Sequence, residues 1–345
     1  MEQLNGMTAE WQLTGEDETF ADAELRGADT TVTTSGNDDG AKPAAGARKK
    51  NLLLIINPVS GTKTAAKYLA EISALFHSYG VRTLLCVTEK SGDATRFVLE
   101  SGREADIICC IGGDGTLNET IAGIKQAGLD VPVGYIPAGS TNDFATSLRL
   151  SPDIMTAAKD VMEGDIVTLD IGRFNDRYFS YVASFGAFTR VSYATPQAAK
   201  NAFGHLAYVV NGILDIGSLR PYEARVVADG VTYEGEFLFA SISNSTSIGG
   251  LLKLPQSEVD MQDGYFELML VRKPADAYDM QDLLGALATK NYHCNAIEFV
   301  RAKHIEVYAD PDTDWSLDGE YEAGCEKVTV ENIPAAIRYI LPKKN

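Results

Sequence analysis

A glycine-rich stretch at residues 112–116, Gly-Gly-Asp-Gly-Thr, has the residue types and spacing to bind phosphate. The apolar run at residues 107–111 before it predicts a buried strand, and helical spacing of apolar residues from Leu117 to Ile124 predicts a helix after it. A glycine turn between strand and helix lets backbone N–H groups approach a phosphate at the positive helix end. The alternative is a plain turn without a ligand, since the spacing matches neither the Rossmann nor the Walker motif.

Asp114 is the unexpected residue in this stretch, because a carboxylate repels phosphate. Its presence is explained if a metal ion or a polarised hydroxyl lies between the two groups. The stretch therefore indicates phosphoryl chemistry assisted by a hard cation.

Three further polar turns fit the same chemistry. Asn-Pro-Val-Ser-Gly at residues 57–61 and Gly-Ser-Thr-Asn-Asp-Phe at residues 139–144 each follow an apolar strand pattern, where ligands bind in open parallel sheets. Asp-Gly-Glu at residues 318–320 follows Trp-Ser-Leu and offers Glu320 as a base for an alcohol nucleophile. The alternative for that third turn is an ordinary hairpin turn with two solvated acids.

The elements that must position these turns fall into two kinds. Strand and helix patterns alternate over residues 49–164, which predicts an α/β nucleotide-binding domain with a parallel sheet. Residues 165–332 contain mainly alternating strand-like segments, which predict an antiparallel, sandwich-like second domain for the substrate, with one helical insert near residues 200–216. The last segment, residues 333–345, is expected to return to the first domain.

Composition limits the classes of partner. The 345 residues suggest two domains, and the formal net charge of −18 argues against nucleic acid and gives no global attraction to an anionic membrane. Residues 1–48 have the composition of a disordered acidic tail. The five cysteines fit no metal spacing and are expected to be reduced, as in a cytosolic protein. No signal peptide or transmembrane run is evident.

Together and in this order, the four turns resemble the bacterial lipid kinases of the diacylglycerol kinase catalytic-domain family, which includes sphingosine and ceramide kinases. The resemblance covers about residues 49–341. It implies a two-domain kinase with ATP in the cleft between the domains. It also implies a set of ATP-binding residues: Asn57, Thr88, Gly112, Gly113, Asp114, Gly115, Thr116, Leu117, Asn118 and Ser140.

The resemblance also implies roles in catalysis and metal binding. Asp114 would organise the catalytic Mg²⁺ through water, and Glu320 would be the general base. A structural Mg²⁺ in the second domain would be bound by the Asp263 side chain and by backbone carbonyls at Asp260 and Tyr265. Relatives often have two acids before the glycine of that turn, whereas this chain has Gln-Asp, so a turn carboxylate without a metal is the alternative.

The resulting expectation is an ATP-dependent lipid kinase that works in the cytoplasm at the inner face of the membrane. Its lipid substrate would be reached by peripheral contact, with diacylglycerol, giving phosphatidic acid, as the first candidate. Two alternatives stay open: a soluble-substrate kinase such as an NAD kinase, and a non-catalytic lipid or nucleotide sensor on the same fold. The sequence does not identify the lipid, the role of the tail or the oligomeric state, for which a homodimer is one option.

Overall fold

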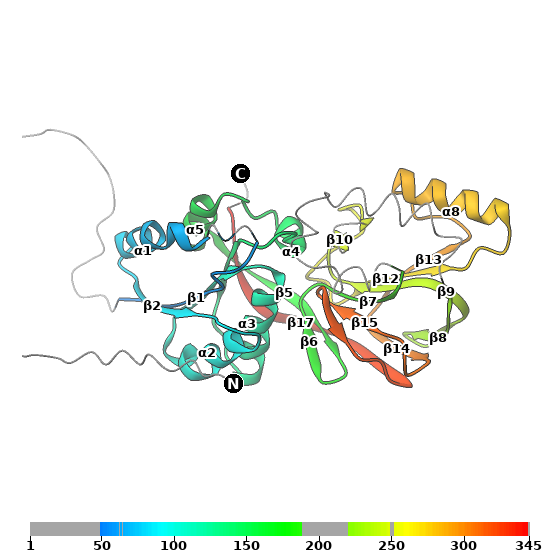
Figure 1. The fold of residues 1–345 in the computed structure, drawn as a ribbon, viewed down its shortest axis with the longest axis horizontal. Coiled ribbons are helices and arrows are strands. Elements are labelled where there is room, and N and C mark those ends of the chain that lie inside the picture. The colour runs from blue at the N-terminus through cyan, green and yellow to red at the C-terminus, as the bar shows by residue number, and fades with distance from the viewer. Residues whose placement is uncertain (1–48, 62, 64, 188–219, 249–251, 344–345) are drawn as a thin grey trace, which may run out of the picture. The chain divides into compact units, whose positions relative to one another are not determined.

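The computed structural model describes residues 49–343 apart from residues 62, 64, 188–219 and 249–251 (Figure 1). The predicted tail at residues 1–48 and the predicted helix at residues 200–216 lie outside the described residues. From residue 49 onward the described residues belong to one compact unit, so the domain boundary at residue 164 stays a prediction.

Four parallel strands form the core of the N-terminal half, in the order β4-β3-β1-β2. They are β1 (Asn51–Ile56), β2 (Arg82–Val87), β3 (Ile107–Gly112) and β4 (Val133–Pro137). The helices are η1 (Ala65–Tyr68), α1 (Leu69–Ser78), α2 (Asp93–Ser101), η2 (Gly102–Glu104), α3 (Asp114–Ala127), α4 (Asp143–Ser147) and α5 (Ile154–Glu163).

The apolar runs in β1, β3 and β4 are continuous because both faces of this part of the sheet are covered, whereas the edge strand β2 is largely exposed. Leu52 and Leu54 of β1 belong to the core that contains Phe76 of α1, whereas Leu53 belongs to the core that contains Ile121 of α3. Figure 1 shows α1 and α5 on one side of the strands and α2 and α3 on the other. A parallel sheet buried on both faces needs this unbroken apolar pattern.

The strands of the C-terminal half pair almost entirely in antiparallel fashion. Aromatic residues such as Phe185, Phe266 and Trp315 fill their main core. The strands are β5 (Asp165–Phe174), β6 (Arg177–Phe179), β7 (Val182–Gly186), β8 (Tyr222–Ala228), β9 (Val231–Ser243), β10 (Ser247–Ile248), β11 (Leu252–Lys253), β12 (Phe266–Arg272), β13 (Ile297–Ala302), β14 (His304–Ala309), β15 (Trp315–Leu317), β16 (Glu320–Glu322) and β17 (Lys327–Leu341). The predicted fold class, an α/β half followed by a mainly antiparallel β-sandwich, is confirmed.

Strand β17 connects the two halves of the molecule. It pairs with β5 along most of its length, and its Tyr339 also pairs in parallel fashion with Val133 of β4. The sequence predicts a strand at residues 326–330 and a separate last segment that begins at residue 333. The structure has one strand with an irregularity between Ile333 and Ile337, where Ala335 has a φ of 50°.

Helix α8 (Ala277–Thr289) was not predicted, because the sequence analysis expected few helices after residue 164. The Asp276 carboxylate caps the helix by accepting hydrogen bonds from the backbone N–H groups of Tyr278 and Asp279. Leu283 and Ala286 are buried at helical spacing. The cap and this spacing were the missed signals.

No helix in the described parts of the chain is long and apolar enough to span a membrane.

We expect two glycine substitutions to change stability in opposite directions. A Cβ at Gly172 would lie 2.0 Å from the ring of the fully buried Phe179, so Gly172→Ala should lower the free energy of unfolding. Overpacking of this kind costs about 1–3 kcal/mol. A Cβ at Gly285 of α8 meets no atom within 4 Å, so Gly285→Ala should raise the free energy by about 0.5–1 kcal/mol. Urea unfolding measures both, and equal stability of Gly172→Ala and wild type would contradict this packing.

Candidate active site

Three of the predicted turns meet at the carboxyl ends of β1, β3 and β4. A Cβ at Gly61 would lie 2.4 Å from the Ala138 carbonyl oxygen, and a Cβ at Gly139 would lie 2.6 Å from the Cα of Gly113. Backbones that approach so closely leave no room for side chains, which explains the glycines. The structure therefore brings together the turns at residues 57–61, 112–116 and 139–144.

Helix α3 starts directly at the glycine-rich turn, as predicted. Gly113 is its N-cap residue, and no side-chain hydrogen bond caps this end of the helix. The Asn57 side-chain amide donates a hydrogen bond to the Thr116 hydroxyl oxygen, 3.3 Å away, which joins the first turn of α3 to the end of β1. The arrangement presents the positive helix end to a ligand, as a phosphate site requires.

A pocket of about 250 Å³ lies beside this turn. Its wall contains five of the predicted site residues, Asn57, Thr88, Gly115, Thr116 and Glu320. The other lining residues, which the sequence analysis did not single out, are Val59, Glu89, Lys90, Ser91 and Glu119.

The remaining predicted nucleotide residues lie outside this lining. Leu117 and Asn118 are buried in α3, and Ser140 is exposed in its turn. The backbone of Gly112 and Gly113 forms the turn itself, and a Cβ at Gly112 would lie 2.5 Å from the Thr116 hydroxyl oxygen. A role for these residues in binding ATP stays a prediction.

The turn before Glu320 is indeed a hairpin turn, but it does not expose both acids. Asp318 and Gly319 have φ values of 51° and 87°, as in a type I′ turn. The Asp318 carboxylate is buried and accepts hydrogen bonds from the backbone N–H groups of Ser180, Tyr181 and Val182. Burial raises the pKa of Asp318 to about 6, although these hydrogen bonds oppose the shift. The turn that carries the predicted base is therefore held in place.

The Glu320 carboxylate lies directly against the glycine-rich turn. A Cβ at Gly115 would be only 2.8 Å from the Glu320 Oε1 atom. The pKa of Glu320 is raised by burial and by the nearby Glu119 carboxylate, while Arg177, 3.9 Å away, lowers it. A carboxylate with a raised pKa, beside a phosphate-binding turn, suits proton abstraction from an alcohol.

Asp114 lies beside a second buried acid, Asp143, whose charge is unfavourable to it. Its Oδ2 atom accepts a hydrogen bond from the Asp143 backbone N–H at 3.0 Å, and the Asp143 Oδ1 atom accepts one from the Ser247 hydroxyl at 2.8 Å. Burial, together with the charge of Asp143, raises the pKa of Asp114 to about 7. A divalent cation would offset this repulsion. Among the described residues no three His, Cys, Asp or Glu side chains form a complete site, so nucleotide and water must supply further ligands.

The contacts at the predicted structural Mg²⁺ site do not by themselves require a metal. The Asp263 carboxylate forms an ion pair with Arg301 and accepts a hydrogen bond from the Tyr265 backbone N–H. The Tyr265 carbonyl accepts one from the Asn332 side chain, and the Asp260 carboxylate accepts one from the backbone N–H of Gln262. Protein partners therefore already contact two of the proposed ligands, the Asp263 carboxylate and the Tyr265 carbonyl, whereas the contact at Asp260 involves its side chain and not the predicted carbonyl. The ligand set stays a prediction, and no step of the reaction depends on it.

Known proteins match both halves of the chain. Residues 51–174 match the model of the diacylglycerol kinase catalytic domain, and residues 182–341 match that of the YegS C-terminal NAD kinase beta sandwich-like domain. The chain is 34% identical over 298 residues to the diacylglycerol kinase of Bacillus subtilis (strain 168), covering 86% of this chain and 97% of the relative. It is also 34% identical over 277 residues to a diacylglycerol kinase of Staphylococcus saprophyticus, covering 79% of this chain and 90% of the relative.

A solved structure with the same fold is that of a diacylglycerol kinase from Bacillus anthracis str. Sterne. It is 22% identical, has a TM-score of 0.70, and the match covers 86% of this chain and 98% of that one. The resemblance inferred from the four turns is thus confirmed. The chain belongs to the diacylglycerol kinase catalytic-domain family of lipid kinases.

Proposed function

We propose that this lipid kinase transfers the γ-phosphate of ATP, with Mg²⁺, to the hydroxyl of diacylglycerol to give phosphatidic acid. The observation that carries the proposal is the contact between the Glu320 carboxylate and Gly115 of the glycine-rich turn. This contact supports the assignment of Glu320 as the base for the lipid hydroxyl, next to the turn that would hold the phosphates. The names of the relatives support diacylglycerol as the acceptor.

The residues of the site have separate roles in the proposed phosphoryl transfer. The backbone at the start of α3 would bind phosphate oxygens, and Asp114 would help to hold the metal ion. Mg²⁺, when bound, neutralises charge on the phosphates. Glu320 accepts the proton of the acceptor hydroxyl while the oxygen of that hydroxyl forms a bond to the γ-phosphorus. The bond from that phosphorus to the β–γ bridging oxygen breaks, and ADP leaves.

We further propose that the enzyme meets its lipid by peripheral contact at the cytoplasmic face of the membrane. With a net charge of −18 the whole molecule has no general attraction to anionic lipid, so the contact must be local. Val59 is one candidate, because it lines the pocket and is 64% exposed.

A radiolabelled-ATP assay tests the acceptor. The enzyme is given Mg²⁺ and mixed micelles of diacylglycerol, phosphatidylglycerol or a sphingoid base, and NAD is offered separately. Label in phosphatidic acid supports the proposal, and label in another single lipid would replace the acceptor. Label only in NADP would identify a soluble-substrate kinase. ATP binding without any transfer would favour the sensor.

We expect Glu320→Ala to abolish transfer while ATP binding is kept. Loss of a general base costs about 10²–10⁴-fold in kcat. The dissociation constant for an ATP analogue should change little, because the backbone of the turn stays intact. The exposed Glu326 provides the matched control, and Glu326→Ala should behave as wild type. Full activity of a folded Glu320→Ala enzyme would exclude this residue as the base.

The pH dependence should report the same residue. Glu320 works as a base only when ionised, so kcat/KM should fall on the acid side with a midpoint above the ordinary glutamate pKa of 4.5. Arg177 lowers the pKa of Glu320, so Arg177→Gln should move this midpoint to higher pH.

Arg173 offers a control for the Arg177 variant, because it pairs with Glu331 instead. Arg173→Gln should leave the acid-side midpoint of kcat/KM unchanged. If this midpoint is also unchanged in Arg177→Gln, a group other than Glu320 controls it.

A further inference from the structure

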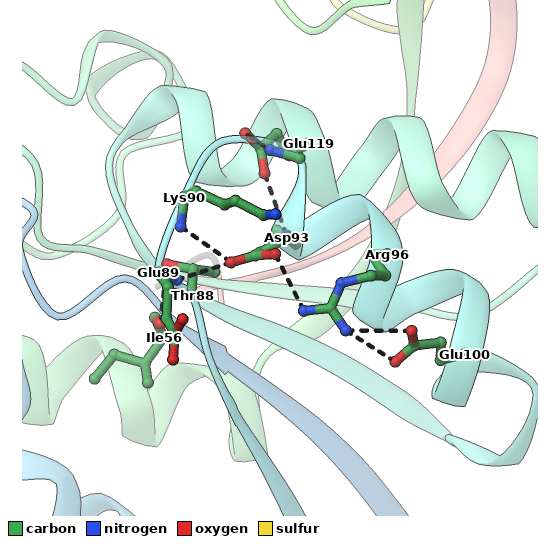
Figure 2. A network of polar contacts seen from close by, with 10 residues as sticks. Ile56, Thr88, Glu89, Lys90, Asp93, Arg96, Glu100 and Glu119 are labelled. Carbon is green, nitrogen blue, oxygen red and sulfur yellow. Dashed lines mark hydrogen bonds and ion pairs between the residues drawn. The ribbon is translucent and has the colours of Figure 1, made fainter.

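Glu119 of α3 follows the glycine-rich stretch by three residues and directs its carboxylate toward the start of α2 (Figure 2). Its Oε1 atom accepts hydrogen bonds from the Ser91 hydroxyl at 2.9 Å and the Gly92 backbone N–H at 2.7 Å. Its Oε2 atom accepts one from the Ala94 backbone N–H at 3.2 Å. Its backbone carbonyl also accepts one from the Thr95 hydroxyl at 2.7 Å. Four contacts thus join one residue of α3 to residues 91–95.

The loop before α2 is also fixed from its other side. The Asp93 carboxylate accepts hydrogen bonds from the backbone N–H groups of Glu89 and Lys90, at 2.8 and 3.0 Å, and pairs with Arg96 at 3.1 Å (Figure 2). These backbone hydrogen bonds, followed by the ion pair, lower the pKa of Asp93 to about 2. Thr88, at the start of the loop, donates its backbone N–H to the Ile56 carbonyl of β1. Two carboxylates therefore determine the path of residues 88–92.

This loop forms one wall of the pocket. Thr88, Glu89, Lys90 and Ser91 all line it. Lys90 is the single basic residue among the described residues of the lining, against the acids Glu89, Glu119 and Glu320. A triphosphate needs positive charge close to it, and Lys90 is the basic residue that the described lining offers for this role.

We propose that Glu119 is a positioning residue for ATP: it ties the loop at residues 88–92 to α3, so that Lys90 faces the nucleotide phosphates held by the glycine-rich turn. This inference rests on the proposed function, because it assigns the pocket to ATP. Glu119 also lines the pocket, but its carboxylate is bound to residues 91–94, so it acts on the nucleotide through the loop. A carboxylate used only to cap α2 would support the fold without affecting nucleotide affinity.

The test measures affinity for a non-hydrolysable ATP analogue with Mg²⁺ by calorimetry, beside KM and kcat for transfer. Glu119→Ala should raise the dissociation constant and the KM for ATP by about tenfold, with kcat reduced less than about threefold. Glu119→Gln keeps an oxygen for Ser91 and Gly92 and should show a smaller increase. Glu71→Ala is the matched control, because Glu71 is an exposed acid of α1 that lies outside both the pocket lining and the loop network.

A double-mutant cycle tests the route through Lys90. If Glu119 acts by placing this ammonium, Lys90→Ala should weaken binding, and adding Glu119→Ala should weaken it little further. Additive effects would overturn the proposed coupling. If the dissociation constant is unchanged in folded Glu119→Ala and Glu119→Gln proteins, Glu119 only caps α2 and does not affect nucleotide affinity. Wild-type enzyme that binds the analogue but labels no lipid would refute the proposed function instead, because the binding data can be interpreted without transfer.

Discussion

The close approach of backbone to backbone at the ends of β1, β3 and β4 is the constraint on which the rest of the site depends. Gly61 meets the Ala138 carbonyl and Gly139 meets Gly113, and a side chain at Gly61 or Gly139 would push the turns apart. The parallel register of the strands brings the turns to one edge of the sheet. Because α3 begins in the middle turn, its positive end is aimed by the sheet and not by a flexible loop.

The C-terminal half contributes the proposed catalytic carboxylate, Glu320, through a small, firmly held element. Asp318 accepts three backbone hydrogen bonds, and its own backbone N–H donates to the Val182 carbonyl. Burying this carboxylate is unfavourable, as its raised pKa shows, but the bonds fix the turn that presents Glu320 to Gly115. Strand β17 pairs with both β5 and β4, so the sandwich is tied to the parallel sheet by continuous backbone.

Local patterns predicted the fold class and the turns well, whereas contacts distant in sequence were beyond them. Apolar patterns and glycine turns depend on near neighbours in the sequence. The succession of strands and helices along the chain, and the helix after the glycine-rich turn, could therefore be predicted. The burial of Asp318 was not, because the residues that bind it begin 138 positions earlier in the chain. The role of Glu119 depends on a loop 25 to 28 positions away, and nothing in the motif itself indicates that contact. In contrast, α8 was missed although its signal is local, because the capping residue Asp276 directly precedes the helix.

The charges of the pocket favour the proposed metal-bound nucleotide over a free nucleotide as its ligand. Glu89, Glu119 and Glu320 line the pocket with one lysine, so a bare triphosphate would meet repulsion there. Bound Mg²⁺ reduces that repulsion and also suits the crowded carboxylates near Asp114. The same acids have a favourable effect on the base, because the charge of Glu119 helps to raise the pKa of Glu320. A stronger base accepts the proton of an alcohol more readily, so the acidity that disfavours free ATP favours the transfer step once the metal has been bound.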